Sequence, residues 1–180
     1  MTENEIITLC KDGDREAFNM LIELYQTRVF NIAYGMLSDY EDASDATQEI
    51  FIKVYRSISS FKGQSAFTTW LYVICRNVCN DILRKRQKQG LTISIYPDDD
   101  ENTVRDIQSD LPTPDEAVEM SERQRAVKDA INSLKQEYKE GLTYIDIMQL
   151  SYDEVARILR CPEGTVKSRL NRARSALRKK

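Results

Sequence analysis

Apolar residues in the first half of the chain recur mainly at intervals of three and four, the spacing of one helix face. They form a first long stretch over residues 6–37 and a second after Asp42 or Ser44, either of which is placed to cap it. Residues 59–65 break the pattern and predict a loop, and a third helix is expected over residues 67–88. No segment alternates regularly enough to require a strand. The pattern therefore predicts an all-α protein.

The pattern lapses after Gly90, which is expected to end the third helix, and several prolines and aspartates follow. Residues 91–120 carry one basic and nine acidic side chains, so little there can pack. We interpret residues 90–116 as a flexible acidic linker, although an acidic mimic of nucleic acid that shields a basic surface stays open. Helical periodicity then returns. The sequence thus predicts two small helical domains, an N-terminal helical bundle over residues 1–89 and a helix-turn-helix domain over residues 117–180.

The composition, with 41% hydrophobic and 31% charged residues, is that of a soluble globular protein. No apolar run approaches the roughly 18–20 residues that a membrane span needs. The N-terminus lacks the basic start and apolar stretch of a secretion signal. We expect a cytoplasmic protein.

Four cysteines are present, Cys10, Cys75, Cys79 and Cys161, and there is no histidine. Cys75 and Cys79 share a helix face, and a zinc site would need the other two cysteines to converge on them. Buried small side chains are the favoured interpretation of these thiols. Without histidine the chain lacks the usual general base and metal ligand. The sequence therefore predicts no metal, no cofactor and no catalytic constellation, which disfavours an enzyme.

The last thirty or so residues predict a helix-turn-helix. Ser151 is placed to cap a short helix, and Glu154 three residues later completes a capping box. Residues 161–164, Cys-Pro-Glu-Gly, interrupt the helix, because proline disfavours helix at the residue before it. A second helix is expected from Thr165, with Val166, Leu170, Ala173 and Leu177 on its buried side. Two short helices joined by a tight turn form the DNA-binding unit.

The positive charge of the C-terminal end suits binding to nucleic acid, because residues 157–180 carry nine basic side chains and one acidic side chain. Lysine and arginine suit guanine edges and asparagine suits adenine. The outward face of the second helix predicts base contacts from Lys167, Ser168, Asn171 and Arg172. Phosphate contacts are expected from Thr165, Arg169, Arg174 and Arg178. A solvated basic helix without a partner is the alternative.

Residues 150–156, Leu-Ser-Tyr-Asp-Glu-Val-Ala, and 164–170, Gly-Thr-Val-Lys-Ser-Arg-Leu, resemble the fourth conserved region of bacterial RNA polymerase sigma factors. The second string is typical of the extracytoplasmic-function group. Residues 42–51 resemble that group's second region, and residues 61–86 its promoter-melting part. Departures from the family pattern are Lys135, where proline is frequent, and the run over residues 142–147. Both departures concern packing more than DNA recognition.

The resemblance implies an alternative sigma factor that binds core RNA polymerase and directs promoter-specific initiation. The helix over residues 42–51 would dock on the clamp helices of the largest polymerase subunit. The residues expected at this contact are Asp45, Gln48, Glu49 and Phe51. Core packing of Phe51 and an ordinary solvated face for Asp45 and Glu49 stay open.

The resemblance also implies that the C-terminal domain reads the upstream promoter element as duplex DNA, while the N-terminal domain captures the melted downstream element. Single-stranded DNA is bound by aromatic and basic side chains. The residues expected there are Phe61, Lys62, Phe67, Arg76, Asn77, Asn80 and Arg84. Trp70 is interpreted as a core residue, with a melting wedge as the alternative.

The expected partners are core RNA polymerase, promoter DNA in double- and single-stranded form, and an anti-sigma factor. No stable homo-oligomer is expected. The competing hypothesis is a helix-turn-helix transcriptional regulator that acts without polymerase. Such a regulator would share the C-terminal half but would have no need for the motif over residues 42–51.

Overall fold

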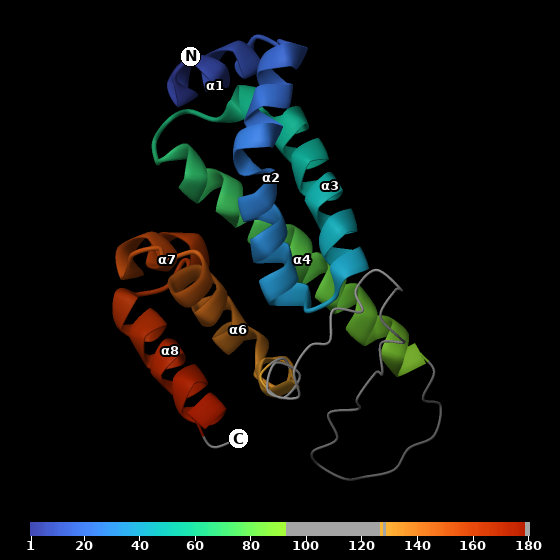
Figure 1. The fold of residues 1–180 in the computed structure, drawn as a ribbon, viewed down its shortest axis with the longest axis vertical. Coiled ribbons are helices and arrows are strands. Elements are labelled where there is room, and N and C mark those ends of the chain that lie inside the picture. The colour runs from blue at the N-terminus through green and yellow to red at the C-terminus, as the bar shows by residue number, and fades with distance from the viewer. Residues whose placement is uncertain (93–126, 128, 179–180) are drawn as a thin grey trace.

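The computed structural model describes residues 1–92, 127 and 129–178, with side chains of the last long N-terminal helix described as far as Lys88. Every regular element in these ranges is helical, which confirms the all-α prediction for them. In Figure 1, α2 and α3 form an antiparallel pair and α4 packs across both. We call α1 to α4 and η1 the N-terminal unit: α1 (Glu3–Lys11), α2 (Arg15–Leu37), α3 (Tyr40–Ser57), η1 (Ile58–Ser60) and α4 (Phe67–Thr92).

The helix starts follow from short polar side chains that accept the first free N–H groups. The Asp14 carboxylate accepts from the N–H groups of Glu16 and Ala17 at 2.8 and 3.0 Å. For α3 the cap is Asp39, whose carboxylate accepts from the Asp42 N–H at 2.9 Å. The predicted caps Asp42 and Ser44 are therefore wrong. The left-handed Ser38 ends α2 and leaves Asp39 extended, so α3 starts earlier.

The predicted apolar stripes form the core of the N-terminal unit. Its largest fully buried side chains include Leu21 and Ile32 of α2, Ile50 of α3 and Leu71 of α4. The expected end of the third helix at Gly90 is wrong, because α4 continues to Thr92. One glycine inside a helix costs only about 1 kcal/mol, which a long helix tolerates.

The C-terminal unit comprises α6 (Gln136–Leu142), the π-helical η3 (Thr143–Ile147), α7 (Tyr152–Leu159) and α8 (Glu163–Arg178). As predicted, Val166, Leu170 and Ala173 of α8 are buried, and Leu177 is partly buried. The second helix begins at Glu163, two residues before the predicted start. The Pro162 carbonyl already accepts the N–H groups of Thr165 and Val166, so proline occupies the position before the helix.

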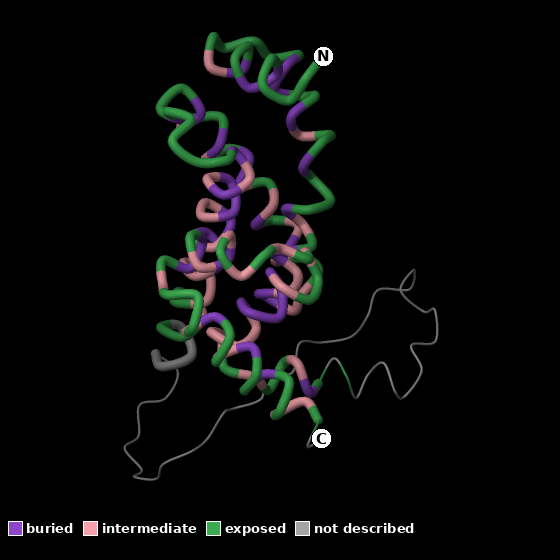
Figure 2. The backbone as a smooth tube through the Cα atoms, turned by 90° about the vertical axis from the view of Figure 1, so that its left-hand side faces the viewer, coloured by how far each residue is buried: buried purple, intermediate pink, exposed green. Residues whose placement is uncertain are grey.

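The two units pack against each other, and buried residues of α7 and α8 join the same apolar core as those of α1 to α4. In Figure 2 the buried positions lie along the inner sides of the helices. A Cβ on Gly35 of α2 would lie 2.5 Å from the hydroxyl oxygen of Thr143. Glycine at this position therefore permits the close approach of α2 to η3. The predicted linker, apart from the end of α4, lies outside the described residues.

None of the helices in the described part of the chain combines the length and apolar character that crossing a membrane requires.

Candidate nucleic-acid interface

The first helix of the predicted helix-turn-helix has the expected capping box at its start. The Ser151 hydroxyl accepts from the Glu154 N–H at 3.3 Å, and the Ser151 N–H donates to the Glu154 carboxylate at 2.9 Å. The pKa of Glu154 is lowered because the Ser151 hydroxyl, at 2.7 Å, and the Ser151 N–H both donate to its carboxylate and stabilise the ionised form. Arg160, in the left-handed conformation, ends the helix. The capping box confirms the predicted start of this motif.

The outer face of α8 carries the four side chains predicted to contact bases. Lys167, Ser168, Asn171 and Arg172 are all exposed. Lys167 forms an ion pair with Glu163 at 2.5 Å and lies over the ring of Tyr152. The hydrogen bond with Glu163 raises the pKa of Lys167. Contact with a guanine edge therefore requires Lys167 to leave Glu163, whereas Asn171 and Arg172 face solvent.

The residues predicted to contact phosphate differ in their surroundings. Arg178 is exposed, whereas Arg174 forms a two-bond ion pair with Asp146. The Arg169 guanidinium lies 3.3 Å from the Glu137 carboxylate of α6, and only 25% of its side chain is exposed. Arg169 therefore joins α8 to α6, and its expected phosphate contact stays a prediction.

We expect Arg169→Ala to lower the free energy of unfolding by about 0.5–1 kcal/mol, because it removes a partly screened ion pair and the packing of the side-chain stem. Chemical denaturation measures this loss. Arg178→Ala, at an exposed position of the same helix, is the control and should leave stability unchanged. Weaker duplex binding by Arg169→Ala without a loss of stability would instead support the phosphate contact.

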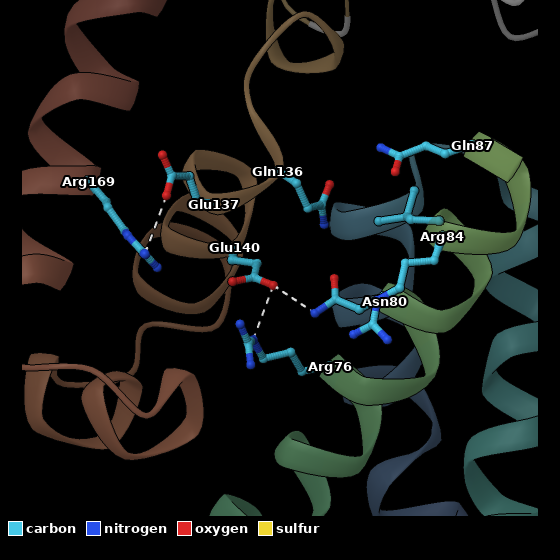
Figure 3. A pocket seen from close by; sticks show the side chains of 9 residues that line it. Arg76, Asn80, Arg84, Gln87, Gln136, Glu137, Glu140 and Arg169 are labelled. Atoms are coloured by element: carbon cyan, nitrogen blue, oxygen red, sulfur yellow. Dashed lines mark hydrogen bonds and ion pairs between the residues drawn. The ribbon is translucent and has the colours of Figure 1, made fainter. Parts of the chain in front are cut away.

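A second polar surface follows α4, where Arg76, Asn77, Asn80 and Arg84 lie on one side of the helix. Asn77 and Arg84 are exposed. Arg76 and Asn80 are partly covered because the Glu140 carboxylate of α6 accepts from both, from Arg76 Nε at 3.1 Å and from Asn80 Nδ2 at 3.2 Å (Figure 3). These groups border a cavity of about 370 Å³ between α4, α6 and α8.

The aromatic residues predicted to contact single-stranded DNA belong to the core. Phe61 and Phe67 are 9% and 5% exposed, and their ring centroids lie 5.5 Å apart. Trp70 packs on both rings at 5.3 and 5.6 Å and is partly buried, in line with the core interpretation. Neither phenylalanine has a free face for stacking in this structure, which corrects their assignment. Lys62 in the same loop is exposed.

The residues of α3 predicted to contact polymerase also divide between the surface and the core. Asp45 and Gln48 are exposed, and Glu49 forms an ion pair with Lys53 at 3.0 Å. Phe51 is 7% exposed and packs in the core, which corrects its assignment to a surface contact.

Two apolar side chains on the same surface of α3 were not predicted as contact residues from the sequence. Ile52 and Tyr55 are 51% and 47% exposed. Their spacing from Asp45 and Gln48 follows the helical period and places all four on one face. Two large apolar side chains exposed side by side make this face of α3 a candidate surface for protein contact.

The thiols do not form a candidate metal site. Cys75 and Cys79 are fully buried, and burial raises the pKa of Cys79 to about 12 and that of Cys75 well above its usual value. No three potential metal ligands cluster within the residues that the structure covers. Burial of the two α4 cysteines agrees with their interpretation as small core residues.

Comparisons with known proteins match both units. The chain matches Sigma-70 region 2 over residues 21–89 and Sigma-70, region 4 over residues 124–177. It is 38% identical to the ECF RNA polymerase sigma-E factor of Haemophilus influenzae, covering 100% of this chain and 95% of that protein. It is 34% identical to the ECF RNA polymerase sigma factor SigW of Bacillus subtilis, covering 94% and 91%.

Solved structures show the same helical arrangement. The sigma factor RpoE of Bartonella quintana, solved with the anti-sigma factor NepR, aligns at a TM-score of 0.68 and 25% identity, covering 90% of this chain and 94% of that one. CnrH, solved with the cytosolic domain of CnrY, aligns at a TM-score of 0.68 over 96% of this chain and 92% of that one. Its identity is 19%, so this second likeness concerns the fold alone.

Proposed function

We propose separate DNA-binding roles for the two units of this chain, which belongs to the extracytoplasmic-function group of RNA polymerase sigma factors. As a member of that family it is an alternative sigma factor that directs promoter-specific transcription by core RNA polymerase. In our proposal the C-terminal unit reads the upstream promoter element and the N-terminal unit captures the melted downstream element. The observation that carries the proposal is the exposed polar face of α8, the helix that follows the capped helix α7 in the helix-turn-helix.

The proposed duplex contact places α8 in the major groove, where an asparagine and an arginine can each form paired hydrogen bonds with a base edge. Asn171 and Arg172 take this role, and Lys167 and Ser168 complete the face. Thr165, Arg174 and Arg178 contact phosphate, with Arg174 exchanging Asp146 for the backbone of the DNA.

The proposed single-strand contact uses polar rather than aromatic groups. The side of α4 with Arg76, Asn77, Asn80 and Arg84, together with Lys62, supplies donors to phosphates and base edges. Capture of unpaired bases offsets the free energy of opening the duplex. The proposed role is DNA binding without catalysis, so the protein acts as an initiation factor and not as an enzyme.

The proposed polymerase contact is the face of α3 that carries Asp45, Gln48, Ile52 and Tyr55, with Glu49 beside it. Polar groups around exposed apolar side chains are the arrangement of a protein interface. Holding both units on one polymerase makes two weak DNA contacts act together.

Regulation by an anti-sigma factor is proposed because a sigma factor of similar fold and 25% identity was solved with one. We further propose a cytoplasmic monomer whose domains span residues 1–89 and 117–180. Both proposals are consistent with a chain that must reach polymerase and promoter DNA together.

Separate roles for bases and phosphates predict different effects of mutation. Asn171→Ala or Arg172→Ala should relax preference at individual upstream positions, at about 1–3 kcal/mol for each lost base contact. Arg178→Ala should weaken binding evenly across sequences. Binding to a randomised upstream element, read by sequencing, measures both. Equal behaviour of the two kinds of variant would contradict the assignment.

Transcription in vitro with purified core polymerase and a randomised promoter library tests the function itself. The protein should direct initiation at promoters that share two sequence elements. Tight sequence-specific duplex binding without polymerase, together with no initiation, would favour the polymerase-independent regulator instead.

A further inference from the structure

The loop over residues 61–66, between η1 and α4, is held by aromatic side chains at its two ends. Phe61 and Phe67 are buried and their ring centroids lie 5.5 Å apart, whereas residues 62–66 between them are all exposed. Gly63 has a φ of +70°, a left-handed conformation that glycine adopts without strain. Because the ends of this loop touch and its middle lies in solvent, its shape depends on what packs against the ends.

Helix α1 packs on η1 and α2 and is connected to both ends of the loop (Figure 1). In its last turn, the Lys11 ammonium lies 5.1 Å from the centroid of the Phe61 ring, which is the geometry of a cation–π contact. In its first turn, the Glu3 carboxylate accepts a hydrogen bond from the Tyr25 hydroxyl at 2.8 Å. The Tyr25 ring packs on Phe67 at 5.5 Å. One end of α1 therefore acts on the loop directly, and the other acts on it through α2.

The fold of α1 itself depends on its apolar side. Ile6, Ile7 and Cys10 are buried and belong to the core of the N-terminal unit. A partly exposed cation on an aromatic ring stabilises a protein much less than the burial of three such side chains. Lys11 and Glu3 therefore affect the position of the loop more than the folding of the helix that carries them.

We propose that α1 positions the loop over residues 61–66 for capture of the melted promoter strand. Lys11 and Glu3 are the positioning residues, and they act through the aromatic ends of the loop and not through contact with DNA. Lys62, a proposed single-strand contact, directly follows Phe61, so holding the Phe61 ring limits where the Lys62 ammonium can lie. A loop that is ordered before binding loses less conformational entropy when it captures a strand. The inference rests on the proposed capture of that strand by the N-terminal unit.

The fluorescence of Trp70 measures the order of the loop ends. Trp70 is the one tryptophan of the chain, and it packs on Phe61 and Phe67 at 5.3 and 5.6 Å. Lys11→Met removes the charge and keeps an unbranched side chain. It should increase the quenching of Trp70 by acrylamide, a neutral molecule that a change in protein charge neither attracts nor repels.

The same variant should open promoters less well in complex with core polymerase. The equilibrium constant for opening should fall about 2- to 5-fold, the effect of losing one exposed cation–π contact. A 2-aminopurine base in the downstream element measures the opening. Formation of the complex should not change, because Lys11 lies outside the proposed polymerase contact on α3.

Tyr25→Phe tests the other end of α1 without changing the net charge. It removes the hydroxyl that donates to Glu3 and keeps the ring that packs on Phe67, so quenching and opening should change in the same direction as in Lys11→Met. Lys11→Arg keeps a cation over the Phe61 ring and should restore wild-type values of both.

Arg15→Met is the control for charge, because it removes the same charge from an exposed position at the start of α2. It should match the wild type in Trp70 quenching and in promoter opening.

Unchanged Trp70 quenching in both Lys11→Met and Tyr25→Phe would overturn the positioning role. Increased quenching with wild-type opening would overturn it as well, since the order of the loop would then have no effect on strand capture. Reduced opening in Lys11→Met alone, with a salt dependence lowered by about one phosphate contact, would indicate direct contact of Lys11 with DNA and would also contradict it.

Lys62→Ala separates the inference from the function on which it rests. Wild-type opening by Lys62→Ala would overturn the proposed strand contact of this loop, even where Trp70 quenching shows that α1 orders it. Reduced opening by Lys62→Ala, with wild-type quenching and opening in Lys11→Met and Tyr25→Phe, would leave the strand contact standing and overturn the role of α1.

Discussion

Ile52→Lys is expected to weaken binding to core polymerase by at least about 2 kcal/mol, roughly 30-fold, without lowering the stability of the protein. Ile52 projects from α3 with 51% exposure, so its replacement removes no core contact. At a protein interface the same side chain becomes buried, and a lysine would carry an unpaired charge into that contact. Surface plasmon resonance on immobilised core polymerase measures the loss.

The matched control is Leu9→Lys, which makes a similar change at an exposed apolar residue of α1, outside the proposed polymerase contact. It should bind polymerase as the wild type does. Thermal unfolding of both variants should match the wild type, because neither side chain belongs to the buried core. Equal loss of binding by the two variants would contradict the assignment of the polymerase contact to α3.

The helices were predictable because each depends on neighbours in the sequence. The buried side of α8 repeats at the helical period, so Val166, Leu170 and Ala173 were placed correctly from spacing alone. The capping box of Ser151 and Glu154 is equally local, since its two members lie three residues apart. Asp39 was missed because several acidic residues near α3 can cap a helix, and the end of α2 at Ser38 selects one of them.

The functional surfaces were only partly predictable, because the same residue types build cores and binding sites. Phe51, Phe61 and Phe67 were themselves expected to make the contacts, yet the structure places all three in the core. Polar residues gave a better signal, since Asn171 and Arg172 are exposed as expected. A polar side chain is rarely buried without a partner, so its position in the pattern predicts exposure. A phenylalanine gives the same sequence pattern whether it lies in the core or in a binding site.

Contacts between the two units had no signal in the sequence. Glu140 and Arg76 lie 64 positions apart, and neither spacing nor composition relates them. The sequence left open an acidic linker that shields a basic surface, but it did not indicate which surface. In the described part of the structure, the Glu140 carboxylate of α6 meets Arg76 and Asn80 of α4.

Leu170→Ala should have the largest effect on stability in the C-terminal unit, at about 2–5 kcal/mol. Leu170 is 1% exposed and packs in a small cluster with Leu142 of α6 and Ala173 of α8. Only a few side chains fill this cluster, so the space left by the substitution has little nearby that can move into it. A small domain has a free energy of unfolding of about 5–15 kcal/mol, and the loss is a large part of it.

The loss of stability in Leu170→Ala should also weaken DNA binding, because Leu170 helps to hold α8 in place. If the helix no longer packs on α6, the outer face with Asn171 and Arg172 is not held in one orientation, and duplex binding falls at every promoter position together. Leu177→Ala is the matched control, because Leu177 packs on the same cluster but is only partly buried, so its effect should be clearly smaller. Urea denaturation and duplex binding, measured on both variants, should rank them in the same order. Equal stability of the two variants would mean that α8 is held mainly by its contacts with α7 and not by this cluster.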